Sequence, residues 1–274
     1  MLEEIKKITE FDYYNCNIDQ DFSELVERLA HDLDLDIERG RPKYGYEKAV
    51  HLVRGSTKHM FIQTGGSAVG TGTYTSANGY FSNQFFDWLV KNRIEYQLIR
   101  ADVKIDLDGK EYFTQLANML KKVALNHRLK TSCMGDWVQT NTGRTLYVGS
   151  RQSPVYCRLY EKGHQFSFAS DLVRLEFEIK PKKQARIELA HLPASEFLNV
   201  NRWVTELIEM MTQSKIKQSD LKLGTIHAPS DHERALAHLV KQYQKTIRKQ
   251  LTIDGGSLDN LWHTLTSHEN WKNE

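Results

Sequence analysis

The sequence predicts an α+β fold with a largely antiparallel sheet, and two observations support this. Extended segments and helices come in the order two strands, helix, strand, helix and three strands over residues 44–180. From about residue 195 onward, apolar residues recur at helical spacing instead. The chain has 274 residues, of which 40% are hydrophobic, so it can bury a substantial core and is not a disordered chain.

The first 80 residues contain one helix, two extended segments and a glycine-rich stretch. Residues 21–35 carry apolar residues at helical spacing, and the region of Pro42 ends this helix. Extended segments are predicted at 44–53 and 57–64. Residues 65–79, GGSAVGTGTYTSANG, are expected to be loop or turn with short strand pieces. A nucleotide-phosphate loop is excluded there, because the Lys-Ser/Thr pair of that motif is missing.

The remaining elements follow in order. Helices are predicted at 81–90 and 112–123 around a strand at 96–107, and a polar linker at 126–142 precedes extended segments at about 144–149, 154–162 and 171–180. Two apolar stripes mark the C-terminal helices: Trp203, Leu207, Ile208 and Met211, then Leu236, Leu239, Tyr243 and Ile247. We therefore divide the chain into an acidic N-terminal helical segment (1–40), an α+β domain (41–194) and a helical C-terminal region (195–274).

Charge is distributed unevenly along the chain. Residues 1–40 contain 4 Lys or Arg against 12 Asp or Glu, whereas residues 41–180 contain 20 against 12. A basic body mixed with aromatic residues is compatible with a polyanionic partner such as DNA. An ordinary solvated basic surface is the alternative. The sequence has no apolar run long enough to span a membrane and no secretory leader, so we expect a cytoplasmic protein.

Three strands each carry one polar face. Side chains alternate between the faces of a strand, so residue parity separates them. The even-numbered residues are Arg100, Asp102, Lys104 and Asp106 in the first strand, Tyr156, Arg158, Tyr160 and Lys162 in the second, and Arg174, Glu176, Glu178 and Lys180 in the third. Such alternation can serve solubility alone. In one sheet, however, the three strands would gather four carboxylates, several cations and two tyrosines on a common surface.

This combination suggests a specific chemistry. Clustered carboxylates repel unless they share protons or a cation, and oxygen ligands suit Mg²⁺ or Mn²⁺. A tyrosine beside a metal and arginines suits phosphodiester transesterification, in which the metal polarises the phosphate and nearby charge activates the phenol. A lone surface tyrosine would be only a contact residue.

At these strands the sequence resembles the replication initiation factor family, Rep_trans, which includes rolling-circle plasmid initiators, relaxases of conjugative elements and replication proteins of filamentous phages. The matching stretches are RADVKID (100–106), TLYVGSRQSPVYCRLYEKG (145–163) and VRLEFEIK (173–180), and TGTYTSANGYF (71–81) matches less closely. The resemblance covers roughly residues 40–210. It implies a five-stranded sheet backed by helices, and a site-specific endonuclease and strand transferase that nicks an origin through a 5′-phosphotyrosine.

The resemblance also implies roles for single residues. Tyr160 would be the nucleophile, with Tyr156 as the fallback. Asp102 and Glu176 would bind the metal, with Asp106 and Glu178 as further members of that set. The cations Arg158, Lys162 and Arg174 would hold phosphate, and Arg100 and Lys104 would contact DNA. His164, close to Tyr160 in sequence, is a candidate acid or base.

The implied partners are origin DNA, single-stranded or supercoiled, with a host helicase and polymerase and a possible homodimer. Two other functions stay open. A non-catalytic protein would use the charged sheet and its aromatics to hold single strands. A carboxylate-metal nuclease would use water, and Tyr160 would then be incidental.

Overall fold

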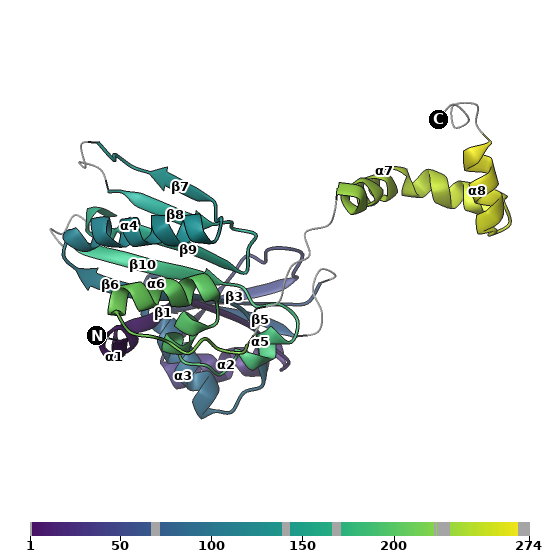
Figure 1. The fold of residues 1–274 in the computed structure, drawn as a ribbon. Helices are drawn as coiled ribbons and strands as arrows, with labels where there is room; N and C mark the ends of the chain where they lie inside the picture. Colours follow the sequence, from purple (N-terminus) through teal and green to yellow (C-terminus); the bar gives the residue numbers. More distant parts are fainter. Residues whose placement is uncertain are drawn as a thin grey trace. The chain divides into compact units, whose positions relative to one another are not determined.

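The structure is a computed structural model that describes residues 2–66, 72–138, 143–165, 171–221, 223 and 231–267. The chain divides into two compact units, residues 1–226 and 227–274 (Figure 1). The predicted helices at 21–35, 81–90 and 112–123 are confirmed as α2, α3 and α4. The helices of the first unit are α1 (Leu2–Lys7), α2 (Phe22–Leu33), α3 (Tyr80–Lys91), α4 (Glu111–Asn126), η1 (Lys162–Gln165), α5 (Ala185–Glu188), η2 (Ala194–Asn199) and α6 (Arg202–Thr212).

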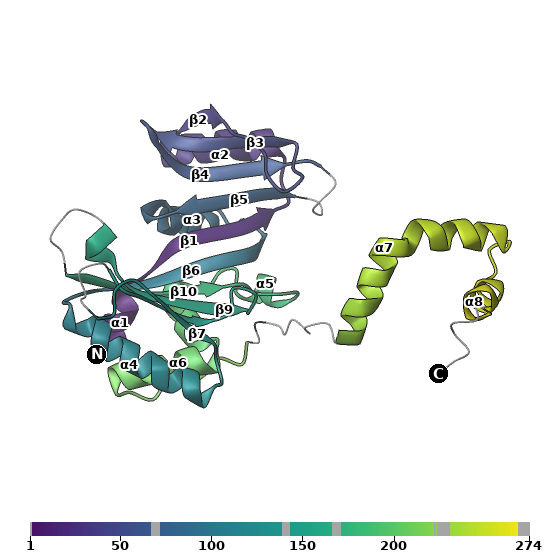
Figure 2. The same cartoon turned by 90° about the horizontal axis from the view of Figure 1, so that it is seen from above.

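The described residues form one ten-stranded sheet in the order β2-β3-β4-β5-β1-β6-β10-β9-β8-β7 (Figure 2). Every neighbouring pair is antiparallel, so the predicted sheet type is confirmed. The expected number of five strands is wrong. The strands are β1 (Thr9–Ile18), β2 (Asp36–Arg39), β3 (Lys48–Arg54), β4 (Thr57–Thr64), β5 (Thr73–Asn78), β6 (Tyr96–Asp108), β7 (Thr131–Met134), β8 (Thr145–Gly149), β9 (Val155–Glu161) and β10 (Leu172–Ile179).

Four of these strands were not predicted as complete strands, for physical reasons. β2 and β7 are the two edge strands; each has four residues, all exposed, so neither shows the alternation that marks a half-buried strand. β5 lies inside the glycine-rich stretch, where only short strand pieces were expected.

β1 corrects the expectation of a helical segment over residues 1–40. This strand lies in the middle of the sheet, between β5 and β6. A β-bulge between Phe11 and Tyr13 adds Asp12 to the strand and shifts its register against β6. As a result Phe11 and Tyr14, three positions apart, are both fully buried and their rings lie 4.8 Å apart. Apolar residues three positions apart are typical of one face of a helix. The bulge therefore removes the alternation by which a strand is recognised in the sequence.

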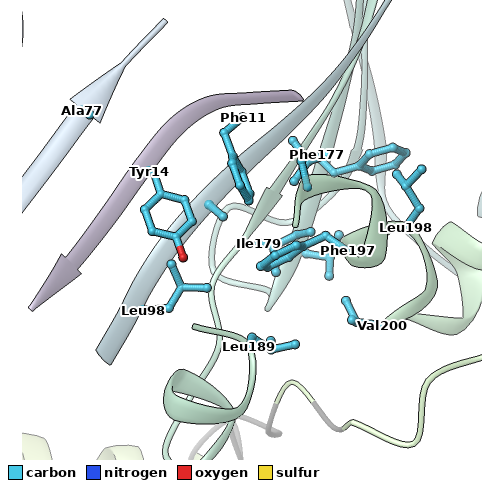
Figure 3. Close-up of a cluster of buried hydrophobic side chains, with 14 of the residues drawn as sticks. Phe11, Tyr14, Ala77, Leu98, Phe177, Ile179, Leu189, Phe197, Leu198 and Val200 are labelled. Carbon is cyan, nitrogen blue, oxygen red and sulfur yellow. The ribbon is translucent and has the colours of Figure 1, made fainter. Parts of the chain in front are cut away.

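The core of the first unit lies between one face of the sheet and the helices. Odd-numbered residues of the central strands, such as Val103, Leu159 and Phe177, have no exposed surface. Figure 3 shows part of this core, where side chains of β1 and β10 gather beside η2. The rings of Phe11 and Phe197 lie 5.7 Å apart, and each such buried ring is worth about 3–5 kcal/mol on replacement by alanine. The opposite face of β6, β9 and β10 is formed by their polar, even-numbered residues.

The C-terminal region that we expected at 195–274 is divided between the two units. Residues of η2 and α6 pack in the first unit, and the predicted stripe is confirmed by the burial of Trp203, Leu207 and Ile208. The second unit contains α7 (Asp231–Ile253) and α8 (Leu258–Thr266). No helix in the described ranges is long and apolar enough to cross a membrane.

Candidate active site

The three predicted polar strand faces form one surface, which we call the polar face. β6, β10 and β9 are neighbours in the sheet, and directly opposed residues of antiparallel strands point to the same side. The register pairs their even-numbered residues: Asp102 with Glu178, Lys104 with Glu176 and Asp106 with Arg174, then Glu178 with Tyr156, Glu176 with Arg158 and Arg174 with Tyr160. The sorting by parity is therefore confirmed for all three strands.

Three carboxylates form the buried centre of the polar face. Asp102, Glu176 and Glu178 expose only 2%, 2% and 8% of their surfaces. Arg100 donates to both oxygens of Asp102, at 2.7 and 2.5 Å, and its Nη2 lies 2.9 Å from Glu178 Oε2. Arg158 Nη2 donates to Glu176 Oε1 and lies 3.3 Å from Asp102 Oδ2. Lys180 Nζ lies 2.7 Å from Glu178 Oε1, so two guanidinium groups and one ammonium group face the three carboxylates.

The consequence is an unusual protonation equilibrium at Asp102. Burial raises the pKa of Asp102 to about 7, although Arg100 acts in the opposite direction, and the charges of Glu176 and Glu178 raise it further. A carboxyl with this pKa is about half protonated at neutral pH, so Asp102 is present there both as the acid and as the carboxylate.

The chemistry of this donor set fits a divalent metal. Three carboxylates offer the oxygen ligands that Mg²⁺ and Mn²⁺ prefer, and a bound cation would offset both the burial of Asp102 and the charges of Glu176 and Glu178, which raise the pKa of Asp102. In the part of the chain that the structure describes, no three such groups are arranged to hold a metal, and the two arginines donate hydrogen bonds to the carboxylate oxygens. The Arg100 and Arg158 side chains are 32% and 29% exposed, so both reach the surface of the polar face. Asp106, the fourth predicted ligand, does not join the three.

Asp106 instead belongs to a second ion-pair group around Arg174. Arg174 is 4% exposed and donates two hydrogen bonds of 2.6 Å to Asp106 and one of 2.7 Å to Asp12. Burial opposes ionisation of Asp106, but the hydrogen bonds from Arg174 outweigh it and lower its pKa. Lys104 Nζ lies 3.3 Å from Asp106 and 3.0 Å from Glu10. Arg174 is therefore held inside the protein rather than presented to solvent.

Tyr160 lies between the two groups. Its hydroxyl donates a hydrogen bond of 3.2 Å to Glu176 Oε2. Burial raises the pKa of Tyr160 well above its ordinary value, the charge of Glu176 raises it further, and Arg174 lowers it. The phenol is consequently neutral at neutral pH, with a carboxylate in place to accept its proton and a fixed cation beside it.

The other predicted residues are placed less directly. The ring of Tyr156, the fallback nucleophile, stacks on Tyr147 at 5.8 Å, and Tyr156 has no hydrogen bond to a carboxylate within the described residues. Lys162 follows β9, and burial together with Arg174 lowers its pKa. The side chain of His164 lies outside the part of the chain that the structure describes.

Two residues of β1, Asp12 and Tyr13, lie beside the site and were not predicted. Asp12 reaches Arg174 because it is the extra residue of the β1 bulge. Tyr13, the next residue, stands opposite Asp102, and the Arg100 guanidinium lies 4.9 Å from the centre of its ring. Recognition of β1 as a strand would have been required to find either residue.

Comparisons with known proteins agree with this geometry. Residues 97–265 match the family model described as replication initiation factor. A solved structure of a rolling circle replication initiator protein from Geobacillus stearothermophilus is similar, with a TM-score of 0.51 at 17% sequence identity; the match covers 82% of this chain and 90% of that chain. No curated protein sequence matches this chain. At that identity the structural likeness concerns the fold.

Proposed function

This chain belongs to the replication initiation factor (Rep_trans) family, and from that membership we propose that it is a rolling-circle replication initiator or relaxase. It would nick one DNA strand at an origin by transesterification and later rejoin it. The hydrogen bond from the Tyr160 hydroxyl to Glu176 is the observation that supports this proposal most directly.

In the proposed reaction, the Tyr160 oxygen attacks the scissile phosphorus and the bond from phosphorus to the 3′ oxygen breaks. The phenol proton passes to Glu176, and the departing 3′ oxygen takes up a proton to become a 3′ hydroxyl. The 5′-phosphotyrosine is still a phosphodiester. A 3′ hydroxyl can therefore attack it later and rejoin the strand without ATP.

The surrounding residues would position Tyr160 and bind the phosphate. Arg174 is a positioning residue, whose charge favours the phenolate that forms as the proton leaves Tyr160. Asp12 and Asp106 hold Arg174 in place. Arg158 and Lys162 would hold the phosphate, because both lie within two residues of Tyr160 on β9 and the start of η1.

Asp102, Glu176 and Glu178 are the residues that would hold Mg²⁺ or Mn²⁺, and the metal when bound would polarise the scissile phosphate and stabilise its developing charge. Origin DNA is the proposed substrate. A host helicase and polymerase would act at the nick in the cytoplasm, and a homodimer remains a prediction.

Covalent capture tests the function. The protein is incubated with Mn²⁺ and labelled single-stranded and supercoiled DNA from its own genetic neighbourhood, and a denaturation-resistant adduct is sought. We expect an adduct that is lost with chelator, with Tyr160→Phe and with Glu176→Gln, and retained with Tyr156→Phe as the matched control.

Two outcomes would contradict the proposal. Cleavage without an adduct would indicate a nuclease that uses water. Binding without cleavage, on a set of fragments that covers the origin, would indicate a non-catalytic single-strand-binding protein.

A further inference from the structure

The polar face continues beyond the catalytic residues into a hollow on the neighbouring strands. This aromatic hollow has a volume of about 280 Å³, and its lining includes Tyr13, Lys43, Tyr44, Lys58, Phe61 and Gln63. The register places it on the same side of the sheet as the active site, because Tyr13 stands opposite both Asp102 and Asn78. The volume is just below the range of about 300–1,000 Å³ that is typical of small-molecule sites, which favours a small group.

The lining combines aromatic rings with positive charge. The rings of His51 and Phe61 lie 4.8 Å apart, and Lys43 Nζ lies 5.4 Å from the centre of the Phe61 ring. The Tyr13 and Tyr74 hydroxyls are 3.3 Å apart. Lys43 and Lys58 are the cations of the lining, and no carboxylate is among its described residues. An anion that carries flat rings fits this composition.

Tyr44 stands out at the rim of the hollow. Its side chain is 80% exposed, although tyrosine normally buries much of its ring. Its backbone has φ of 56°, a region that favours glycine or asparagine. A large aromatic residue is thus presented to solvent from an unfavourable conformation, beside two lysines.

The floor of the hollow contains an amide with an unused donor. Gln63 is fully buried, and its Oε1 accepts a hydrogen bond of 3.1 Å from the backbone N–H of Lys43. Its Nε2 has no hydrogen-bond partner within the described residues. A buried amide donor without a partner costs free energy, so a ligand that accepts its hydrogen bond would gain affinity there.

The hollow is also continuous with the active site. Tyr13 lines the hollow, and the Arg100 guanidinium that binds Asp102 lies over the same ring. Three strand spacings of about 4.8 Å separate β1 from β9, and Tyr160 lies four residues, or about 13 Å, along β9 from Tyr156, which is across from Tyr13, so Tyr13 and Tyr160 are about 20 Å apart on the sheet. A few nucleotides of a single strand can span that distance.

We propose that the aromatic hollow binds one unstacked base of the single-stranded DNA on which the active site acts, and this rests on the proposed function. Tyr44 and Phe61 stack on the base, Gln63 Nε2 donates to an acceptor on its edge, and Lys43 and Lys58 hold the adjacent phosphates. The hollow thereby sets which stretch of the strand reaches Tyr160.

The test separates the base from the backbone. Fluorescence anisotropy is measured with two probes, a 20-nucleotide oligothymidylate and an abasic strand of the same length, in chelator and with Tyr160→Phe so that nothing is cut. Stacking on one base is worth about 1–3 kcal/mol. We therefore expect Tyr44→Ala to weaken oligothymidylate binding by about 5-fold to 140-fold, and to leave binding of the abasic strand unchanged. Lys43→Ala should weaken binding of both probes.

Exposed residues outside the hollow serve as controls. Tyr80, 74% exposed at the start of α3, and Lys91, exposed at the end of α3, do not line the hollow, so Tyr80→Ala and Lys91→Ala should change neither affinity. Tyr44→Ala removes an exposed side chain and should leave the fold intact. Gln63→Met replaces a buried side chain, so thermal unfolding must show that this variant is still folded. Equal loss on both probes with Tyr44→Ala, or no loss, overturns the proposal. Because the assay involves no cleavage, this result is independent of whether Tyr160 forms an adduct.

Discussion

Replacing Asp102 by asparagine should increase the stability of the protein relative to the wild type as the pH rises from 4.5 to 8. The raised pKa of about 7 means that the folded chain keeps a proton on Asp102 at pH values where the unfolded chain, with an ordinary aspartate pKa of 3.8, has lost it. Stability falls with pH wherever the folded state binds more protons. The contribution of Asp102 is therefore most favourable below about pH 4 and is lost as the pH rises to about 7.

The size of the effect follows from the two pKa values. They differ by about 3, and each unit of pKa corresponds to 1.36 kcal/mol, so the loss amounts to up to about 4 kcal/mol. Asp102 is 2% exposed, and solvent therefore screens little of this. Asparagine cannot ionise and keeps the shape of the side chain, so the Asp102→Asn variant should escape the loss.

Urea unfolding followed by tryptophan fluorescence, in chelator at pH 4.5, 6, 7 and 8, measures the difference. The unfolding free energy of the variant minus that of the wild type should increase from pH 4.5 to pH 8. Asp171→Asn is the matched control, because Asp171 is 50% exposed and its pairing with Lys110 is at the surface. Parallel pH profiles for wild type and Asp102→Asn would show that Arg100 and Arg158 fully compensate the Asp102 charge, and the reasoning would be refuted.

Three further predictions concern the metal, the ion pairs and the core. Mn²⁺ at a hundred times its dissociation constant should stabilise the wild type by about 2.7 kcal/mol and Asp102→Asn by less, measured as a shift in the urea midpoint at pH 8; equal shifts would exclude Asp102 as a ligand. Arg174→Met should cost about 3–5 kcal/mol in the same assay, since it removes the buried cation that pairs with Asp12 and Asp106 and leaves Lys104 as the cation beside Asp106, and Arg174→Lys should cost less. A cost under 1 kcal/mol for Arg174→Met would contradict that reading. Phe197→Ala should cost about 3–5 kcal/mol by thermal unfolding, whereas Leu258→Ala, at a 71% exposed position of α8, should cost almost nothing; similar effects would mean that η2 does not anchor the sheet.

The polar face could be predicted because its signal is local. Alternation within single strands, such as Arg100 to Asp106, is enough to assign side chains to a face when no bulge interrupts the strand. Which residues then meet across strands depends on register between segments about 70 residues apart, as for Arg174 and Asp106. The sequence therefore predicts a cluster of carboxylates and arginines, and only the structure separates Asp106 from Asp102.

Elements whose signal is not local were missed. A single inserted residue, Asp12, was enough to make β1 look helical, because it places Phe11 and Tyr14 on the same side. Because β1 was not predicted as a strand, the position of β5 beside it, and that of the aromatic residues around Tyr13, could not be predicted either. The site assignments for Tyr160, Lys162 and the DNA contacts remain predictions that the capture and binding experiments test.

The central position of β1 has a consequence for how the chain acquires its structure during synthesis. Thr9 pairs with Ile105, so this strand leaves the ribosome 96 residues before its partner in β6. At elongation rates of about 5–20 residues per second, β6 is synthesised on the order of 5–20 s after β1, and one edge of β1 stays unpaired during that time. Until then the nascent chain carries an unpaired, aromatic-rich edge, which is the condition under which chaperones bind and aggregation begins. Yield in cells should accordingly depend on translation rate and chaperone supply more than the equilibrium stability of the finished sheet would suggest.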